Sequence, residues 1–323
     1  MAPQRYDRPF CEYQEMVNHL VHDYGLIIKD NDFAIHALKV FTYYDLVNGY
    51  KDSLMINERY RRGITIELLC KLRIFDKDFQ NILFSRMIMI ENFFKNTLSY
   101  IIAKNFGVNH KEYLHLKNYN YAIKHINFLN TLKEIHAVID SPHTPMPTAH
   151  YKNNHNHIPP WILFKNISFS NSINLFRALK AREKDYIVNE LLPSQRLDYP
   201  KKVEFLTSGL NLLRKCRNQI AHNLKFVTFQ GNYLDNLKEI SITSLLPMQL
   251  TKTNDIYKTL GTKDLYAVIL FIYAVLPDKN LKDFFLNDLF CYISDNVEVF
   301  EEYACITKLP MDILTRIKAT TTV

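Results

Sequence analysis

Apolar residues recur at intervals of three and four along most of the chain, a spacing typical of helices that bury one face. The clearest example is the segment 206–223, where four of five positions on one helical face are apolar: Leu206, Leu210, Leu213 and Ile220. The fifth position is Arg217. An arginine on a face that should meet the core is costly to bury unless it is paired or lines a wet cleft. Pro200 suits a first helical turn, so this helix is predicted to run from there to His222.

The same spacing predicts a long helical region at residues 64–107, started by Thr65. Asp76 or Asp78 is expected to break this region into two helices. The second helix is apolar on every side at residues 87–90, so it is expected to be central. Further helices are predicted at residues 13–24, 33–44, 127–139, 161–179, 186–192, 263–275 and 281–292.

Prolines interrupt the helical pattern at residues 140–160. This stretch holds five prolines and four histidines, and prolines at such density exclude a helix interior. It is therefore predicted to be a long flexible loop. A metal site on its histidines is the alternative, but the stretch has no cysteine and no helical i,i+4 pair. The histidines are His143, His150, His155 and His157. Trp161, the only tryptophan, follows directly and is expected to anchor the core.

The composition supports a mostly helical chain. Only 7 of 323 residues are glycine, whereas phenylalanine and tyrosine are abundant. We therefore predict an all-α fold with an N-terminal helical region at 1–63, a helical core at 64–292 that includes the proline-rich loop, and a C-terminal tail at 293–323. Within the tail, residues 309–323 are expected to hold one short helix and to fray. Residues 226–247 are expected to form an irregular connection with a short strand.

Cysteine usage and hydropathy favour a cytoplasmic protein without a membrane segment. The five cysteines are scattered, odd in number and free of any CxxC pair. Residues 1–10 hold no apolar run of the kind that a secretory signal needs, and the apolar run at 265–276 is too short to span a bilayer. The net charge is +7, from 40 basic and 33 acidic residues. This charge permits an acidic partner such as nucleic acid without requiring one.

Polar side chains gather on the two central helices. Asn218 and His222 are one turn apart, next to the face that carries Arg217. Glu91 and Lys95 have the same spacing inside the apolar helix. They either form an ordinary ion pair on a wet edge or border a functional cleft, and the scarcity of other polar residues there favours the cleft. Likewise, Arg217 either snorkels outward beside an ordinary histidine or belongs to a site.

Two stretches concentrate positive charge. The first is ERYRR at residues 58–62, for which a solvated loop is the simpler interpretation, and the second extends over residues 177–184. The basic residues concerned are Arg59, Arg61 and Arg62 in the first stretch and Arg177, Lys180, Arg182 and Lys184 in the second.

The segment Arg217-Asn-Gln-Ile-Ala-His222 is an R-x4-H motif with asparagine after the arginine, and it resembles the signature of HEPN-superfamily ribonucleases. Glu91-x3-Lys95 is similar to a secondary E-x3-K motif found in some of them. Other segments occur in an order that resembles the abortive-infection family of the AbiD/AbiF type over residues 15–290: YYDLVNGY, IFDKDFQNIL with MIENFFKN, His150-Tyr151, PPWILFKNISFSNSINLF and RKCRNQIAHN. Two positions depart from the pattern, since Asp45 stands where an arginine is expected and Asn223 follows the motif histidine.

The resemblance implies a HEPN-like helical bundle that acts as a metal-independent endoribonuclease without a cofactor. It also implies a homodimer in which two R-x4-H motifs face one cleft. Arg217 and His222 would be the catalytic pair, and Asn218 would orient the cleft or hold the phosphate. Glu91 would pair with Arg217 or fix a histidine tautomer, and Lys95 would hold phosphate.

The residues themselves are compatible with this chemistry. RNA is cut without a metal when its 2′-hydroxyl attacks the adjacent phosphate, which leaves a 2′,3′-cyclic phosphate. The reaction needs a base, an acid for the leaving 5′-oxygen and a cation for the added negative charge. Histidine serves either proton role, and arginine offers a planar fork of donors. On an ideal helix, Arg217 and His222 point about 140° apart, so either the helix ends before His222 or a second chain completes the site.

The family further implies a toxin that acts in phage defence and is restrained by a small RNA. Both basic stretches would then contact RNA, mainly at its phosphates, together with Arg214, His150 and Tyr151. Neither DNA nor a membrane is an expected partner. Three alternatives stay open: a non-catalytic HEPN-like module that binds RNA or protein, a helical scaffold, and a metalloenzyme built on the histidine-rich loop.

Overall fold

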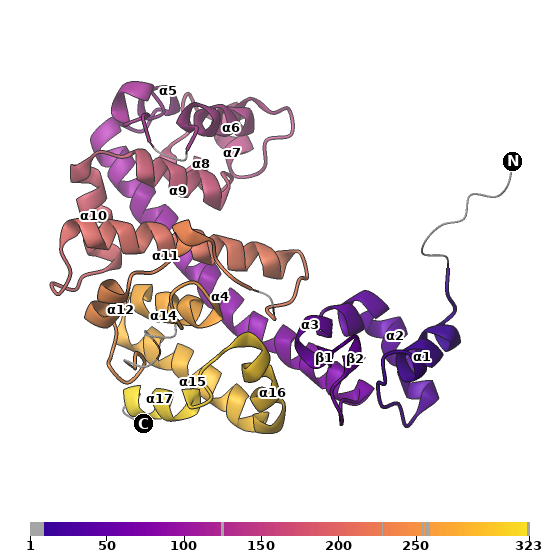
Figure 1. The fold of residues 1–323 in the computed structure, drawn as a ribbon. Coiled ribbons are helices and arrows are strands. Elements are labelled where there is room, and N and C mark those ends of the chain that lie inside the picture. Colours follow the sequence, from indigo (N-terminus) through magenta and orange to yellow (C-terminus); the bar gives the residue numbers. More distant parts are fainter. Residues whose placement is uncertain (1–9, 124–125, 228, 253–254, 256–258, 322–323) are drawn as a thin grey trace, which may run out of the picture.

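Figure 1 shows the fold in a computed structural model, which describes residues 10–123, 126–227, 229–252, 255 and 259–321. The first nine residues, on which the expectation about a secretory signal rests, lie outside these ranges. Apart from one short hairpin and a single bridge, the regular structure of the described residues is helical. The predicted all-α class is therefore confirmed.

A single helix of 41 residues, α4 (Ile66–Phe106), runs through the molecule and contacts helices from every part of the chain (Figure 1). Thr65 caps it, because its hydroxyl accepts a backbone hydrogen bond at 3.2 Å. The predicted break at Asp76 or Asp78 is wrong. Asp76 lies inside the first third of the helix, is fully buried and accepts a hydrogen bond from the Tyr303 hydroxyl, so its carboxylate makes a distant contact and does not cap a helix.

The N-terminal elements lie together at the start of α4 (Figure 1). They are α1 (Tyr13–His22), α2 (Asn31–Phe41), the π-helical turn η1 (Tyr44–Asn48), α3 (Lys51–Leu54), β1 (Met55–Ile56) and β2 (Arg59–Tyr60). The loop expected at residues 58–62 is thus partly a β-hairpin. Asn57 and Glu58 form its two-residue turn with φ values of 50° and 63°, the left-handed conformation that favoured hairpin turns require.

Beyond α4, the chain forms a series of shorter helices before the second long one. These elements are α5 (His110–Tyr113), η2 (Leu116–Asn118), α6 (Phe128–Asp140), α7 (Thr148–Asn154), α8 (Pro160–Leu163), α9 (Phe169–Ala178), α10 (Ala181–Leu191) and α11 (Tyr199–Ala221). The prediction of a loop throughout residues 140–160 is wrong, because the prolines gather at both ends and leave Thr148 onward free to form α7. Helix α10 is also longer than the predicted 186–192.

The C-terminal part packs against α4 and α11. Its elements are η3 (Tyr233–Asp235), α12 (Glu239–Leu245), α14 (Leu265–Val275), α15 (Lys279–Asp295), α16 (Val297–Thr307) and α17 (Ile313–Thr320). In the described part of residues 226–247, η3 and α12 replace the expected strand. Helix α17 lies within residues 309–323, where one short helix was predicted. Helix α16 was not predicted, and it buries Phe300 and Tyr303 against Phe75 of α4. The division of the chain at residues 63 and 292 stays a prediction.

Helix α11 crosses α4 and also packs on α9, α10 and α14 (Figure 1). The predicted apolar face of α11 is buried at Leu206, Leu210 and Leu213. Gly209 on α11 allows close approach of α14, because a Cβ atom at this position would lie 2.0 Å from ring carbons of Phe271. This packing fixes α11 across the middle of the molecule, with its last turns against α4.

Candidate functional site

The crossing of α4 and α11 brings three predicted site residues together, Glu91, Lys95 and Arg217, which we call the site cluster. Lys95 Nζ lies 2.8 Å from Glu91 Oε1 and donates to the backbone carbonyl of Ile167 at 2.9 Å. Arg217 Nε lies 3.7 Å from Glu91 Oε2. Glu91 and Lys95 are only 8% and 9% exposed, so their ion pair does not lie on a wet edge. It belongs to the interior and faces the motif arginine.

Arg217 has hydrogen-bonding capacity that the described residues do not use. Its Nη1 donates to Asn218 Oδ1 at 3.2 Å, and its side chain is 35% exposed. Among the described residues, the buried atoms Arg217 Nε and Glu91 Oε2 have no hydrogen-bond partner. Because 3.7 Å exceeds a hydrogen-bond distance, the carboxylate attracts the guanidinium without saturating it. An oxyanion can therefore take the remaining N–H groups.

A small cleft of about 120 Å³ opens beside the site cluster. Its walls also include Trp161 and Lys165. At about 30 Å³ for each water molecule, the cleft holds a few waters or one phosphate-sized group, so most of any longer ligand lies outside it. The prediction that Trp161 anchors the core is wrong, because its side chain is 46% exposed. It lies in the first turn of α8, and the preceding prolines indicate the helix start but not which way the indole points.

His222 directly follows α11, whose last residue is Ala221, so the helix ends one residue before the predicted limit. Of the two alternatives given by the helix geometry, completion of the site by a second chain stays a prediction. Asn223 adopts a left-handed conformation with φ 59°, and its N–H bonds the carbonyl of Ile220 at 2.9 Å. The N–H of Leu224 bonds the carbonyl of Gln219 at 2.9 Å. These two bonds are those of a Schellman cap. The His222 side chain is exposed, and its ring makes no hydrogen bond within the described ranges.

Three side chains on one face of α4, Arg73, Asp76 and Gln80, hold the turn after His222. Arg73 donates to the backbone and side-chain oxygens of Asn223 at 3.3 and 3.4 Å. Gln80 donates to the backbone carbonyl of Leu224 at 2.9 Å. Asp76 accepts a hydrogen bond from the backbone N–H of Phe226 at 3.3 Å. The long helix therefore supports both the arginine and the histidine of the motif.

Asp76 is the centre of this supporting network. It accepts hydrogen bonds from the Tyr303 hydroxyl at 2.7 Å and from Gln80 Nε2 at 2.8 Å. Burial raises the pKa of Asp76 to about 6, against the opposing effects of the Tyr303 hydrogen bond and of the Arg73 charge. Asp45, which stands where the resemblance leads one to expect an arginine, lies 3.6 Å from Arg73. It therefore helps to neutralise the cation behind the His222 turn. Sequence reasoning did not identify this network.

The basic residues predicted to contact RNA are divided between two regions. In the N-terminal hairpin, Arg59 donates to the His22 carbonyl at 3.0 Å, Arg61 pairs with Glu302, and Arg62 is exposed. This hairpin lies at the start of α4, whereas the site cluster lies past the middle of that helix (Figure 1). The structure thus does not bring the first basic stretch to the site cluster.

In the second region, Lys180 and Arg182 are exposed and Lys184 is half-buried. Burial, and after it the charge of Arg177, lowers the pKa of Lys184. Arg177 and Arg214 line a hollow of about 750 Å³ between α6, α9, α11 and η3. Arg214 lies one turn before the motif arginine on α11, so this hollow adjoins the site cluster.

Helix α7 carries His150 and Tyr151. His150 is exposed, and its ring centroid lies 5.5 Å from that of His155, which also packs 4.6 Å from Tyr151. Within the described ranges, no group of three or more His, Cys, Asp or Glu side chains is placed to hold a metal ion. Contact of His150 and Tyr151 with RNA stays a prediction.

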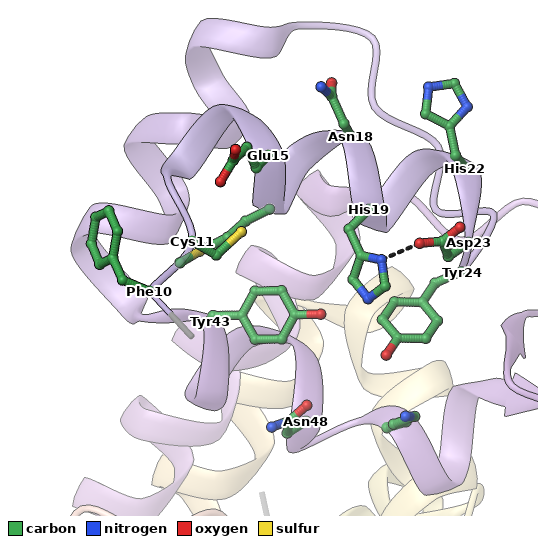
Figure 2. A pocket seen from close by; sticks show the side chains of 12 residues that line it. Phe10, Cys11, Glu15, Asn18, His19, His22, Asp23, Tyr24, Tyr43 and Asn48 are labelled. Atoms are coloured by element: carbon green, nitrogen blue, oxygen red, sulfur yellow. Dashed lines mark hydrogen bonds and ion pairs between the residues drawn. The ribbon is translucent and has the colours of Figure 1, made fainter. Parts of the chain in front are cut away.

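A further hollow, of about 1300 Å³, lies in the N-terminal region and has no counterpart in the sequence-based predictions (Figure 2). His19 pairs with Asp23 in it and packs 4.7 Å from the ring of Tyr24. Its two carboxylates, Glu15 and Asp23, outnumber its one ammonium group, Lys51. This charge does not favour phosphate binding, which distinguishes it from the hollow beside α11.

The described residues form an all-α protein whose two longest helices cross at a buried charged cluster. None of its helices combines the length and the hydropathy needed to cross a bilayer, within the ranges described. A family model for Abi-like proteins matches residues 36–227, more than half of the chain, so the chain belongs to the Abi-like protein family. No curated protein matches it, and no solved structure does. The matched region contains the site cluster and His222 but ends before η3.

Proposed function

We propose that this Abi-like protein is a metal-independent endoribonuclease of the HEPN type that acts as a toxin in phage defence. The observation that carries the proposal is the site cluster, in which the Arg217 guanidinium keeps free donors beside a buried Glu91–Lys95 pair. An exposed histidine, His222, follows at the end of the same helix. Family membership supports the role in abortive infection.

In the proposed cleavage, the 2′-oxygen of RNA attacks the adjacent phosphorus and its proton passes to a base. The bond to the 5′-oxygen of the next nucleotide breaks, and an acid protonates that oxygen, so the products carry a 2′,3′-cyclic phosphate and a 5′-hydroxyl. His222 serves as the base or the acid. Arg217 stabilises the added negative charge on the phosphate oxygens.

The other motif residues act by positioning Arg217. Asn218 accepts a hydrogen bond from Nη1 and so orients the guanidinium. Glu91 faces Nε and balances the positive charge. Lys95 is already engaged by Glu91 and by the carbonyl of Ile167, so we assign it to holding Glu91 in place and not to binding phosphate.

The proposal includes a homodimer. Arg217 and His222 are separated by more than one helical turn, so one phosphate is reached more easily by residues of two copies than by both from one copy. A twofold axis close to the end of α11 would gather two arginines and two histidines around one phosphate. Light scattering after gel filtration tests this arrangement: we expect the mass of a dimer, and a monomer that cleaves RNA would contradict it.

The test of the activity is RNA cleavage in the presence of EDTA. Arg217→Ala and His222→Ala are each expected to cut at least about 100-fold more slowly than the wild type, with unchanged circular dichroism and mass. Arg196→Ala and His36→Ala are matched controls at exposed positions outside the site and should cut at the wild-type rate. Fragments should end in a 2′,3′-cyclic phosphate. Wild-type rates in both motif variants would refute the assignment, and RNA binding without cleavage would favour the non-catalytic module.

We also propose that a small RNA restrains the toxin. The net charge of +7 and the exposed cations Lys180 and Arg182 at α10 support this partner. The ratio of absorbance at the nucleic-acid and protein maxima, followed by sequencing of extracted RNA, should reveal one discrete species in the purified protein. A protein free of RNA would remove this part of the proposal and leave the ribonuclease assignment to its own test.

A further inference from the structure

The hollow between α6, α9, α11 and η3 has walls made mostly of polar side chains, and asparagines come from each of its sides. Its volume of about 750 Å³ falls in the range of small-ligand sites, about 300–1,000 Å³. Some of its amides are already used, as where Asn174 donates to Thr131 Oγ1 at 3.0 Å. Three other amides, those of Asn171, Asn211 and Asn236, make no side-chain hydrogen bond among the described residues.

Asn171 lines the hollow with a side chain that is only 5% exposed. In the part of the chain that the structure describes, its amide makes no side-chain hydrogen bond, and the same holds for Asn211 and Asn236 in the same walls. The amide atoms of these three residues are accessible to solvent in the hollow. Amides in this position can bind a ligand with donors and acceptors of its own.

One cation of the hollow is also unsatisfied. Arg214 Nε is buried and has no hydrogen-bond partner among the described residues. Lys215 beside it is different, because its ammonium group pairs with Asp235. Tyr233 stands at the rim with 74% of its surface exposed. The hollow thus combines a free guanidinium, solvent-accessible amides that make no side-chain hydrogen bond among the described residues, and an exposed aromatic ring.

We propose that this hollow binds an unpaired nucleotide of an RNA strand. A guanidinium binds phosphate, so Arg214 takes the phosphate group. An amide presents donors and an acceptor in one plane, which complements the edge of a base, so Asn171 and Asn211 contact the base. Aromatic rings stack on bases, so Tyr233 covers its face. The inference rests on the proposed function, which supplies RNA as the ligand, and adds that the RNA is single-stranded at this point.

The position of Arg214 relates the hollow to the site cluster. On α11 it lies three residues before Arg217 and four before Asn218, so its side chain emerges about one turn, or 5.4 Å, away along the same helix. A strand held in the hollow therefore leads its neighbouring phosphate to Arg217. The base in the hollow selects which phosphate is cut, and cleavage should show a nucleotide preference next to the cut bond.

The test is binding, measured by fluorescence anisotropy in a His222→Ala background with EDTA, so that RNA stays intact. The probes are a short labelled single-stranded RNA of mixed sequence and the same RNA annealed to its complement. Tyr233→Ala should weaken single-strand binding about 5- to 100-fold and leave duplex binding unchanged. Arg214→Ala should weaken it and reduce the salt slope by about one. Tyr44→Ala, 69% exposed in the N-terminal region, is the matched control and should bind normally.

The outcomes separate this inference from the ribonuclease proposal. Unchanged affinity in both Tyr233→Ala and Arg214→Ala overturns the inference even if the wild type cuts RNA. Loss of binding in these variants upholds it even if the wild type never cuts. Mononucleotides added as competitors distinguish the source of the ligand, and displacement of RNA at equal concentrations would overturn the assignment to a strand in favour of a free nucleotide.

Discussion

Replacing Tyr303 with phenylalanine removes one buried hydroxyl and preserves the shape of the core. The hydroxyl donates to Asp76 Oδ1 at 2.7 Å, and both side chains are fully buried. A hydrogen bond to a charged group contributes about 1.5–3 kcal/mol to stability. We therefore expect Tyr303→Phe to lower the free energy of unfolding by this amount at about pH 7.5, where Asp76 is ionised.

The loss should be smaller in acid. Burial raises the pKa of Asp76 from 3.8 to about 6, a difference of about 3 kcal/mol in free energy. Because the folded pKa is the higher one, the stability that the protonated form contributes is complete below pH 3.8 and is lost as the pH rises through 6. Removing the Tyr303 donor raises the folded pKa further. At about pH 5, the hydroxyl bonds a neutral carboxyl group, and its removal should cost only about 1 kcal/mol.

Urea unfolding at both pH values, followed by far-ultraviolet circular dichroism, measures the two losses. Tyr292→Phe is the matched control, because the Tyr292 hydroxyl donates at 3.1 Å to the neutral backbone carbonyl of Phe75, on the same helix as Asp76. This control should cost about 1 kcal/mol at either pH. Equal losses for Tyr303→Phe at the two pH values, or a stronger pH dependence in the control, would refute the reasoning.

Two further substitutions test the packing of α11. Gly209→Ala should lower the free energy of unfolding by about 1–3 kcal/mol, because the added Cβ would lie 2.0 Å from the Phe271 ring. Thermal unfolding measures this loss, and adding Phe271→Leu should restore part of it. Asn223→Ala should lower the free energy of unfolding by about 1–2 kcal/mol and Asn223→Gly by less, because φ at this position is 59° and glycine adopts it freely. Urea unfolding of the two variants measures this order. Equal losses would mean that the contact with Arg73 dominates.

Helical periodicity predicted those elements that bury one face and carry local start signals. Helix α11 begins one residue before Pro200 and ends one residue before His222, close to the predicted limits. The break at Asp76 was predicted because an acidic residue inside a helical pattern is typical of a cap. Its partners, the backbone N–H of Phe226 and the Tyr303 hydroxyl, are 150 and 227 residues away along the chain, and no local pattern reveals them.

The candidate site was predictable where its members follow helical spacing. Glu91 and Lys95 lie one turn apart, and Arg217 interrupts an apolar face, so the three could be singled out before their contact was known. The exposure of Trp161 and the contact made by Tyr303 could not be predicted from the sequence pattern. The exposure of Trp161 depends on how α8 lies against α4, and Tyr303 belongs to α16, in a stretch where no helix was predicted.

Helix α4 supports the turn after His222 through Asp76 and faces Arg217 through Glu91, and both anchor residues belong to one uninterrupted helix. Inserting or deleting a single residue between them would rotate one anchor against the other by about 100° and shift it by about 1.5 Å. Substitutions that keep the length leave this relation intact. The number of residues between Asp76 and Glu91 is therefore constrained more tightly than the identity of those residues.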